Sequence, residues 1–557
     1  MSASHGVFAQ TANPDNSLLP EINPQDIEIR SEFRASFPGL RRQPILGFNP
    51  KPRVYRIDPN RLPYLEPLDE AVANISVTQL DRPAPPERTL LYAPDRTRGY
   101  IQAGLGSFIA PTVDAYAFHQ LSNSSSVAGA VDYRSSGDHL DQNSSFRTFT
   151  ANGQWQTALS SKERLSVAAT ATSDFNYLGV QSQGGAVSAI DAPRKEYNGF
   201  GVMGSYSSFK NAVEGIQVHA GANVWLSSLD TDIFPTQGET NEAVFSFNAS
   251  KKWAGNQVQE VIETLGAVRG GSYDSNVLGS NTWLDARGGL RYQRILEGGT
   301  RVEGTGEVAF MSDPNSSRVY LAPKVSITHQ LKDRLQLSGS VYGSPSIQSV
   351  QDHHLINRFL TTGIQLQHQY ELGAHAMLSV KPAKRMELFG GVQYQFIRDY
   401  AFYNATFQSS AGGLTSSTSF TLNFADATVF EVFTGTVYHV VPNQLSIDGK
   451  LYARSPRFSA GGAIPFEEEF GLEATARYSP KRSFTLTSWV EYLGQRPTNR
   501  NTNLDAFLLV NAEAEYKINN RIGVFAKVLN ILGQEYQVWQ GFEERPFQLF
   551  GGLTLKF

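Results

Sequence analysis

The chain has 557 residues, a mean hydropathy of −0.30 and a formal net charge of −4. No stretch approaches the roughly 18 consecutive apolar residues of a transmembrane helix, which excludes a helical membrane protein. The small net charge gives no reason to expect nucleic acid as a partner, and the absence of cysteine excludes disulfides and cysteine chemistry.

The first nine residues resemble the end of a secretory signal. Gly6, Val7, Phe8 and Ala9 place small or apolar side chains where a signal peptidase reads, although no basic region or full apolar stretch precedes them. We therefore expect residues 1–9 to be the remnant of a signal peptide. The alternative is an ordinary disordered terminus.

Residues 10–97 form a proline-rich N-terminal segment that holds about half of the 27 prolines. Repeated proline removes backbone donors and fixes φ, so neither a long helix nor a central strand can run through it. Apolar and basic residues such as Ile27, Phe33 and Arg41 are more frequent than a solvated tether needs. We predict an extended segment, either periplasmic or inserted into the lumen of a barrel.

From Arg98 to Phe557 apolar and polar residues alternate, as expected of strands with two different faces. In residues 504–516 one parity is wholly apolar, whereas the other includes Asn511, Glu513 and Glu515 as candidate lumen-facing polar residues. The same split appears in residues 385–397, 445–454, 470–478 and 484–492. Aromatic residues reach 11% and glycines number 48, which suits a membrane barrel, although a soluble sandwich alternates too.

Tight-turn residues recur at about ten places, and longer connections lie between them. The turns are expected near Asn123, Ser161, Asn211, Gly255, Gly298, Lys332, Pro382, Pro442, Pro480 and Asn519. Residues 181–193, 344–360, 401–416 and 532–544 are the predicted long loops. Short turns at one rim and long loops at the other predict an all-β fold, a transmembrane antiparallel β-barrel of roughly 22 strands over residues 98–557.

The chain ends on a strand without a charged tail. Over residues 546–557, Phe547, Leu549, Leu553, Leu555 and Phe557 share one parity. Gly552, Leu555 and Phe557 resemble the C-terminal membrane-insertion signal of bacterial outer-membrane barrels, with Phe550 in place of the usual polar residue.

Residues 524–536 resemble the penultimate strand and the following asparagine-leucine stretch of TonB-dependent receptors, and residues 545–557 resemble their last strand. That family carries a globular plug after a TonB-binding box. Residues 10–97 are too short and too rich in proline for such a plug, and Ile27-Glu28-Ile29 is the nearest match to a box. The chain is therefore most similar to the plugless receptor-like barrels of the Bacteroidota, and energised import does not follow.

The resemblance implies an integral protein of the bacterial outer membrane, with its long loops outside and its termini in the periplasm. Its expected partners are outer-membrane lipid, lipopolysaccharide and the barrel-assembly machinery, and a periplasmic or outer-membrane protein could dock on residues 10–97. The first functional hypothesis is a receptor or transport-type pore, closed by its own N-terminal segment or by a partner. The alternative is a structural or assembly component of an outer-membrane complex.

Motifs for other functions are weak, and we predict no enzyme, no cofactor, and no catalytic or metal site. Residues 199–204 match a GxGxxG motif, but the residues around them alternate as in a β-strand. Close packing therefore explains the glycines better than phosphate binding does. Asp352-His353-His354 offers metal ligands in a predicted surface loop, yet neighbours on an extended chain point apart. Residues 467–469, three glutamates, are expected at a solvated strand end, and His375 is expected to be a solvated lumen residue.

Overall fold

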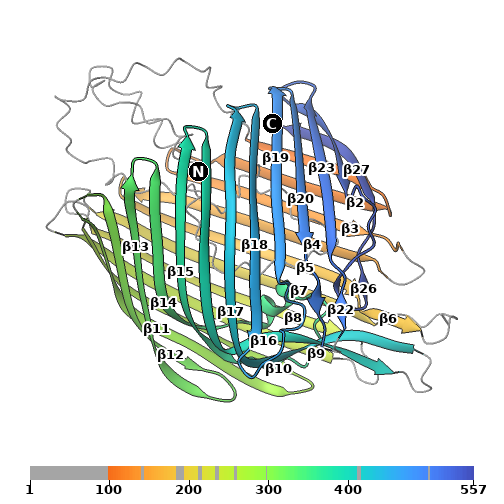
Figure 1. Ribbon diagram of the computed structural model, residues 1–557, viewed down its shortest axis with the longest axis horizontal. Helices are drawn as coiled ribbons and strands as arrows, with labels where there is room; N and C mark the ends of the chain where they lie inside the picture. The colour runs from red at the N-terminus through yellow and green to blue at the C-terminus, as the bar shows by residue number, and fades with distance from the viewer. Residues whose placement is uncertain are drawn as a thin grey trace.

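The computed structural model describes residues 98–139, 144–182, 193–210, 216–232, 238–255, 260–296, 298–409, 415–499 and 502–557. They form a closed antiparallel β-barrel of 22 strands, which confirms the predicted fold class (Figure 1). No described helix is long and apolar enough to cross a membrane. The predictions for residues 1–9 and 10–97 lie outside the described residues.

The strands follow one another around the wall in chain order. They are β1 (Gly99–Gly106), β2 (Ala110–Gln120), β3 (Ser125–Ser136), β4 (Phe146–Ser160), β5 (Glu163–Tyr177), β7 (Arg194–Lys210), β8 (Ile216–Thr231), β9 (Gly238–Ala254), β10 (Val261–Ser275), β11 (Gly279–Leu296), β12 (Thr300–Ser312), β13 (Ser317–Lys332), β14 (Leu335–Ile347), β15 (His368–Ala383), β16 (Met386–Ser409), β17 (Thr415–Val441), β18 (Leu445–Phe458), β19 (Phe470–Lys481), β20 (Phe484–Leu493), β23 (Phe507–Lys517), β24 (Ile522–Leu529) and β27 (Gln548–Lys556). Smaller elements belong to the connections between the wall strands: β6 (Gly179–Ser182), α3 (Val350–Ile356), β21 (Arg496–Pro497), β22 (Asn503–Leu504), β25 (Gln537–Trp539) and β26 (Phe542–Glu543).

The barrel closes where the last strand pairs with the first. Strand β27 runs antiparallel to β1 from Tyr100 opposite Lys556 to Gly106 opposite Phe550, so no edge is left open in the wall. The ring of Phe525 lies over the directly paired glycines Gly104 and Gly552. A Cβ on either glycine would meet that ring at 2.5–2.6 Å, so close packing requires glycine here.

The two rims differ as the turn pattern predicted. Nine of the ten predicted turn positions lie at, or within two residues of, a short gap between consecutive strands at one rim, which we call the short-turn rim; the tenth, Asn211, lies outside the described residues. The C-terminus lies at this rim in Figure 1. The opposite rim, here the long-loop rim, carries the longer connections, including residues 348–367 and 530–547.

The structure also confirms the predicted apolar faces of strands β23 and β27. Leu508 and Tyr516 of β23 are exposed, as are Leu549, Leu553 and Leu555 of β27, so these apolar side chains point to the outside of the wall. The alternation of the sequence thus separates a lipid-compatible outer face from an inner face.

The predicted loop at residues 401–416 is wrong. Strand β16 continues to Ser409 and β17 begins at Thr415, and the two pair with each other beyond the barrel wall. Strand β6, from the connection between β5 and β7, pairs antiparallel with Thr415–Thr418 of β17 (Figure 1). These residues stay extended because mutual pairing satisfies backbone groups that no longer have a neighbour in the wall.

Candidate functional site

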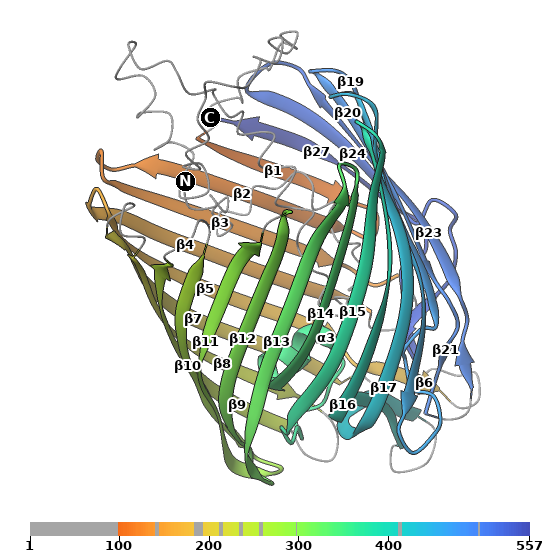
Figure 2. The ribbon, with the colours of Figure 1, turned by 60° about the vertical axis from the view of Figure 1, so that its left-hand side comes forward.

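The connection between β14 and β15 folds into the barrel instead of projecting from it. Helix α3 lies within the lumen, between β14 and β15 on one side and the opposite wall (Figure 2). We call residues 348–367 the inner lid. Val350, Leu360, Ile364 and Leu366 are buried to 1% exposure or less, so the lid has an apolar core of its own.

Helix α3 begins at a capping box. Ser349 Oγ accepts a hydrogen bond from the Asp352 backbone N–H at 3.2 Å, and the Asp352 carboxylate accepts one from the Ser349 N–H at 2.9 Å. The next two backbone donors, on Val350 and Gln351, reach the two carboxylate oxygens of Glu242 on β9 at 3.0 and 3.3 Å. The wall therefore satisfies helix donors that would otherwise lack partners.

Arg269 of β10 fastens the same end of the lid. Its guanidinium donates to the Ile347 carbonyl at 3.2 Å and to the Asp352 carboxylate at 2.8 Å. Its guanidinium carbon lies 5.2 Å from the centre of the Trp283 ring, within range of a cation–π interaction.

A buried charge cluster holds the other end of α3 against β5 and β7. Asp174 of β5 accepts a hydrogen bond from Arg358 at 2.8 Å and lies 3.1 Å from Nε2 of His354. The Lys195 ammonium of β7 donates to the Arg358 carbonyl. Lys195, His354 and Arg358 are 3% exposed or less. Removing the Asp174 carboxylate would therefore leave buried positive charge without a counter-ion.

The inner lid also contacts the hairpin that β16 and β17 form beyond the wall. His353 Nδ1 lies 3.1 Å from the Tyr403 hydroxyl on β16, and the Thr361 N–H donates to the Phe420 carbonyl on β17 at 2.9 Å. Residues 415–418 of the same hairpin pair with β6, which follows β5 in the chain. The lid is therefore joined both to the wall and to this hairpin.

The lid returns to β15 along a row of polar contacts. Thr240 donates to the Thr362 carbonyl at 2.7 Å, and the Thr231 and Thr362 hydroxyl oxygens are 3.4 Å apart. The Leu366 N–H donates to the Tyr273 hydroxyl at 3.2 Å.

A second inward-folded connection, residues 530–547, completes the closure. The ring of Phe542 stacks on Phe359 with centroids 3.6 Å apart, and Trp539 packs against Phe420 at 5.1 Å. Arg496, 1% exposed, donates to the Val538 carbonyl at 2.8 Å and so ties this connection to the neighbouring one. The long-loop mouth is thus filled by a mixed aromatic and charged core.

His354 is the titratable group of the lid with the clearest shift. Burial lowers its pKa from 6.5 to about 4, an effect reinforced by Lys195 and opposed by Asp174. The imidazole also stacks on the Tyr197 ring at 4.3 Å. The closed lid therefore holds a neutral histidine at neutral pH.

The predicted polar residues of β23 lie away from the inner lid. Asn511 is fully buried and accepts a hydrogen bond from the Asn530 N–H at 2.8 Å. Glu513 lies 4.0 Å from the Lys527 ammonium, on the face opposite to Leu508 and Tyr516, and Glu515 follows on the same face. A role for these three residues toward a passing solute stays a prediction.

The three residues of the predicted insertion signal lie on the closing strand. Gly552 belongs to the tightly packed seam with β1, whereas Leu555 and Phe557 are 46% and 58% exposed. Their recognition during assembly also stays a prediction.

Two motif interpretations need correction. Asp352, His353 and His354 lie in the buried helix and not in a surface loop. His353 contacts Tyr403 of β16 and His354 contacts Asp174 of β5, and no metal-binding group of three or more such residues occurs among the described residues. Glu468 is not solvated, since it is 4% exposed and lies 2.8 Å from Arg454, which also binds Glu467.

The close-packing interpretation of the glycine motif agrees with the structure, whereas the solvation of His375 stays a prediction. The glycines of residues 199–204 lie within β7, and a Cβ on Gly199 or Gly201 would meet the Trp225 ring at 2.4 or 2.3 Å. His375 is half-buried and stacks on Phe433 at 5.7 Å.

The sequence interpretation missed the inner lid as a structural element. Two signals were present: the capping pair Ser349 and Asp352, and the apolar spacing of Ile356, Phe359 and Leu360 within a supposed loop. No pattern of neighbouring residues in the sequence marked Asp174, Lys195 or Glu242 of the wall as contacts of the lid.

The fold and the inner lid define a class before any relative is considered: a wide membrane-type β-barrel whose mouth is closed from within. Solved structures of the same fold include the FrpB iron transporter from Neisseria meningitidis, with 10% identity, a TM-score of 0.66, and 84% of this chain and 83% of that chain covered. The siderophore receptor PirA from Acinetobacter baumannii follows at 9% identity, TM-score 0.65, and 83% and 80% coverage. The copper transporter OprC gives 11% identity, TM-score 0.64, and 83% and 80% coverage.

These neighbours are TonB-dependent outer-membrane receptors with a 22-strand barrel, and they are transporters and receptors, not enzymes. The likeness is one of fold. The sequence itself matches no protein-family model and no curated protein.

Proposed function

We propose that this chain is a receptor or transport-type pore of a bacterial outer membrane, in which the inner lid controls solute entry at the long-loop rim. The observation that carries the proposal is a lid inside the lumen that is joined both to the wall and to the hairpin of β16 and β17, in a barrel whose fold is that of metal and siderophore transporters. A barrel this wide would leak without internal closure. In this proposal the long loops lie outside and both termini lie in the periplasm.

The segment at residues 10–97 is proposed to close the short-turn end, and a partner protein is the other candidate for that role. Because the named neighbours transport iron, copper or siderophores, ferric siderophores and copper ions are the first solutes to test.

A reversible lock on the lid tests gating. The chain has no cysteine, and the Thr231 and Thr362 hydroxyls are 3.4 Å apart, so Thr231→Cys with Thr362→Cys places one disulfide between lid and wall. We expect low conductance across a planar bilayer when this variant is oxidised and a higher conductance after reduction, in the full chain and more clearly without residues 10–97. Single Thr362→Cys is the control and should not respond to reductant.

Equal conductance in both redox states would contradict the gating role. A barrel that stays closed in every form, and that loses a stoichiometric co-purifying protein when residues 10–97 are removed, would favour the scaffold function instead. Uptake of radiolabelled ferric siderophore and copper by cells producing the locked and reduced forms then identifies the solute class.

A further inference from the structure

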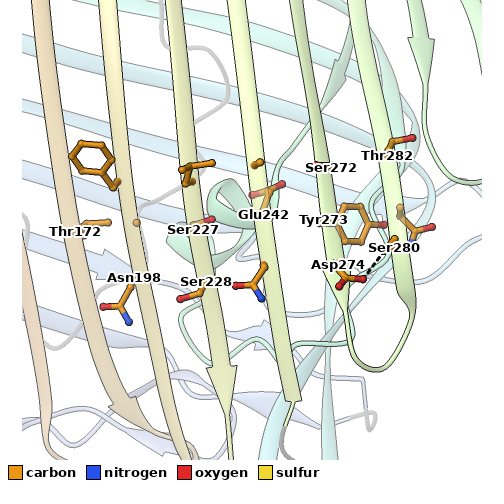
Figure 3. A pocket seen from close by; sticks show the side chains of 16 residues that line it. Thr172, Asn198, Ser227, Ser228, Glu242, Ser272, Tyr273, Asp274, Ser280 and Thr282 are labelled. Carbon is orange, nitrogen blue, oxygen red and sulfur yellow. Dashed lines mark hydrogen bonds between the residues drawn. The ribbon is translucent and has the colours of Figure 1, made fainter.

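The outer wall carries a hollow that transport does not explain. It has a volume of about 670 Å³ and is lined by six neighbouring strands, β5 and β7 to β11, toward the long-loop rim (Figure 3). Hydroxyl and amide side chains dominate its lining, and Asp274 is its only charged group on the outer face. A concave site on the convex outside of a barrel requires small side chains at its floor, here Ser228, Ala243 and Ser272.

The strand register arranges this outer face in rows that run around the barrel. The polar row consists of Asn198, Ser228, Asn241, Asp274 and Ser280, each directly opposite the next. The boundary row, two residues farther from the rim, consists of Phe200, Leu226, Ala243, Ser272 and Thr282. Ten of the sixteen lining residues belong to these two rows. The other six form the row between them and belong to the inner face: Thr172, Gly199, Ser227, Glu242, Tyr273 and Asn281.

The rows on either side of the hollow show that it lies at the edge of the apolar outer face of the wall. Farther from the rim lie Val202, Val224 and Phe245, which are 41%, 50% and 49% exposed. Toward the rim, Glu196, Asp230 and Glu239 are direct cross-strand neighbours, and Glu196 pairs with Arg194. Successive rows thus change from acidic side chains, through polar side chains with the single carboxylate of Asp274, to apolar side chains, as at the boundary between lipid headgroups and acyl chains.

We propose that this hollow binds the sugar headgroup of a membrane glycolipid, with the acyl chains lying over the apolar row. A bilayer lipid is the occupant that the position requires, because its head and its tails meet at this depth. The described lining contains no Lys, Arg or His, and the adjacent carboxylates repel a phosphate, so an uncharged sugar is favoured over an anionic headgroup.

The chemistry of the lining fits hydroxyl groups. Asn198 and Asn241 are exposed amides that donate and accept, and the Ser280 hydroxyl already donates to Asp274 at 2.6 Å, which orients that carboxylate (Figure 3). Phe200, 50% exposed at one end of the hollow, offers a ring face to the apolar face of a sugar.

The test uses the purified full chain in a detergent without sugar, incubated with glucosyl diacylglycerol or with phosphatidylglycerol of the same acyl chains. Native mass spectrometry counts the lipids that stay bound. We expect the glucosyl lipid to be retained roughly tenfold more than phosphatidylglycerol, which corresponds to one or two net hydrogen bonds.

Two variants locate the site. Ser228→Trp fills the hollow and should reduce retention of the glucosyl lipid to the level of phosphatidylglycerol, and the Asn198→Ala, Asn241→Ala double variant should weaken it roughly fivefold. Ser455→Trp makes the same change at an exposed position of β18, opposite outward-facing Phe430, and should leave retention unchanged. Heat-modifiable gel migration checks that each variant is folded.

Equal retention of both lipids would overturn the headgroup assignment. Unchanged glucosyl lipid binding in folded Ser228→Trp, or in the double variant if the tryptophan variant does not fold, would overturn the site itself.

Discussion

The two ends of the barrel lumen use charged residues in different ways. At the long-loop end, the ion pair between Asp174 and Arg358 joins the wall to a segment that crosses the lumen, and both side chains are about 10% exposed or less. Toward the short-turn end, Arg291 pairs with Glu263 at 3.4 Å and with Glu303 at 3.0 Å, all on neighbouring strands. The Arg291 side chain is 33% exposed, whereas that of Glu263 is 6% exposed.

The difference separates charges that hold a segment inside the lumen from charges that line the wall. A pair between neighbouring strands adds little to a register already fixed by backbone hydrogen bonds, and its exposure to water weakens it. A buried pair across the lumen must stay intact, because losing one partner leaves an uncompensated charge in an apolar core. Substitutions in the two regions should therefore differ sharply.

The largest effect is expected for Asp174→Asn. It leaves Arg358 and Lys195 buried without a carboxylate, which should destabilise lid closure by about 3–5 kcal/mol. Hydrogen exchange of the α3 backbone amides, followed by mass spectrometry, measures this opening directly. Asp132→Asn is the matched control, since Asp132 pairs with Arg134 on the same strand, and it should leave α3 exchange unchanged; similar exchange in both variants would contradict the comparison.

Removing the aromatic contact between the two inward connections comes next. Phe542→Ala loses the ring stacked on Phe359, which should weaken closure by about 2 kcal/mol. Faster exchange is expected in residues 358–362 and in the connection at 530–547. Tyr394→Ala truncates an exposed aromatic on the outer face and should change neither region.

Lowering the pH should weaken closure of the lid, because His354 takes up a proton when the lid opens. In the open lid its pKa returns to about 6.5, whereas in the closed lid burial holds it at about 4. The open state therefore takes up a proton as pH falls from 6.5 toward 4, and closure weakens over that window while staying constant above it. Conductance should rise between pH 7 and pH 4.5, and His354→Gln should remove that rise; an unchanged pH profile in the variant would exclude His354 as its source.

The smallest effect is expected for Glu242→Gln. The amide keeps one acceptor for the Val350 and Gln351 donors but loses the charge, which should cost the lid about 1 kcal/mol. Glu513→Gln, in a wall pair with Lys527 at 4.0 Å, should leave α3 exchange within experimental error. A larger change in α3 amide exchange for Glu513→Gln than for Glu242→Gln would contradict the distinction between lid contacts and wall pairs.

The sequence alone determined the wall. Alternation over residues 504–516 and 546–557 predicted strands with one apolar face, and turn residues at ten positions predicted the strand number, because both patterns depend on neighbours close in the chain. The continuation of β16 and β17 into the predicted loop at residues 401–416 was missed because these residues pair with each other outside the wall and carry no periodic membrane face.

Only the tertiary structure decided what fills the mouth. Asp174 and Arg358 are 184 residues apart in the chain, and Glu242 and Val350 are 108 apart, so no local pattern could pair them. The rows of the outer hollow likewise exist only once five strands are in register. Local periodicity specifies a strand and its faces, whereas contacts across the lumen and around the wall depend on closure of the whole ring.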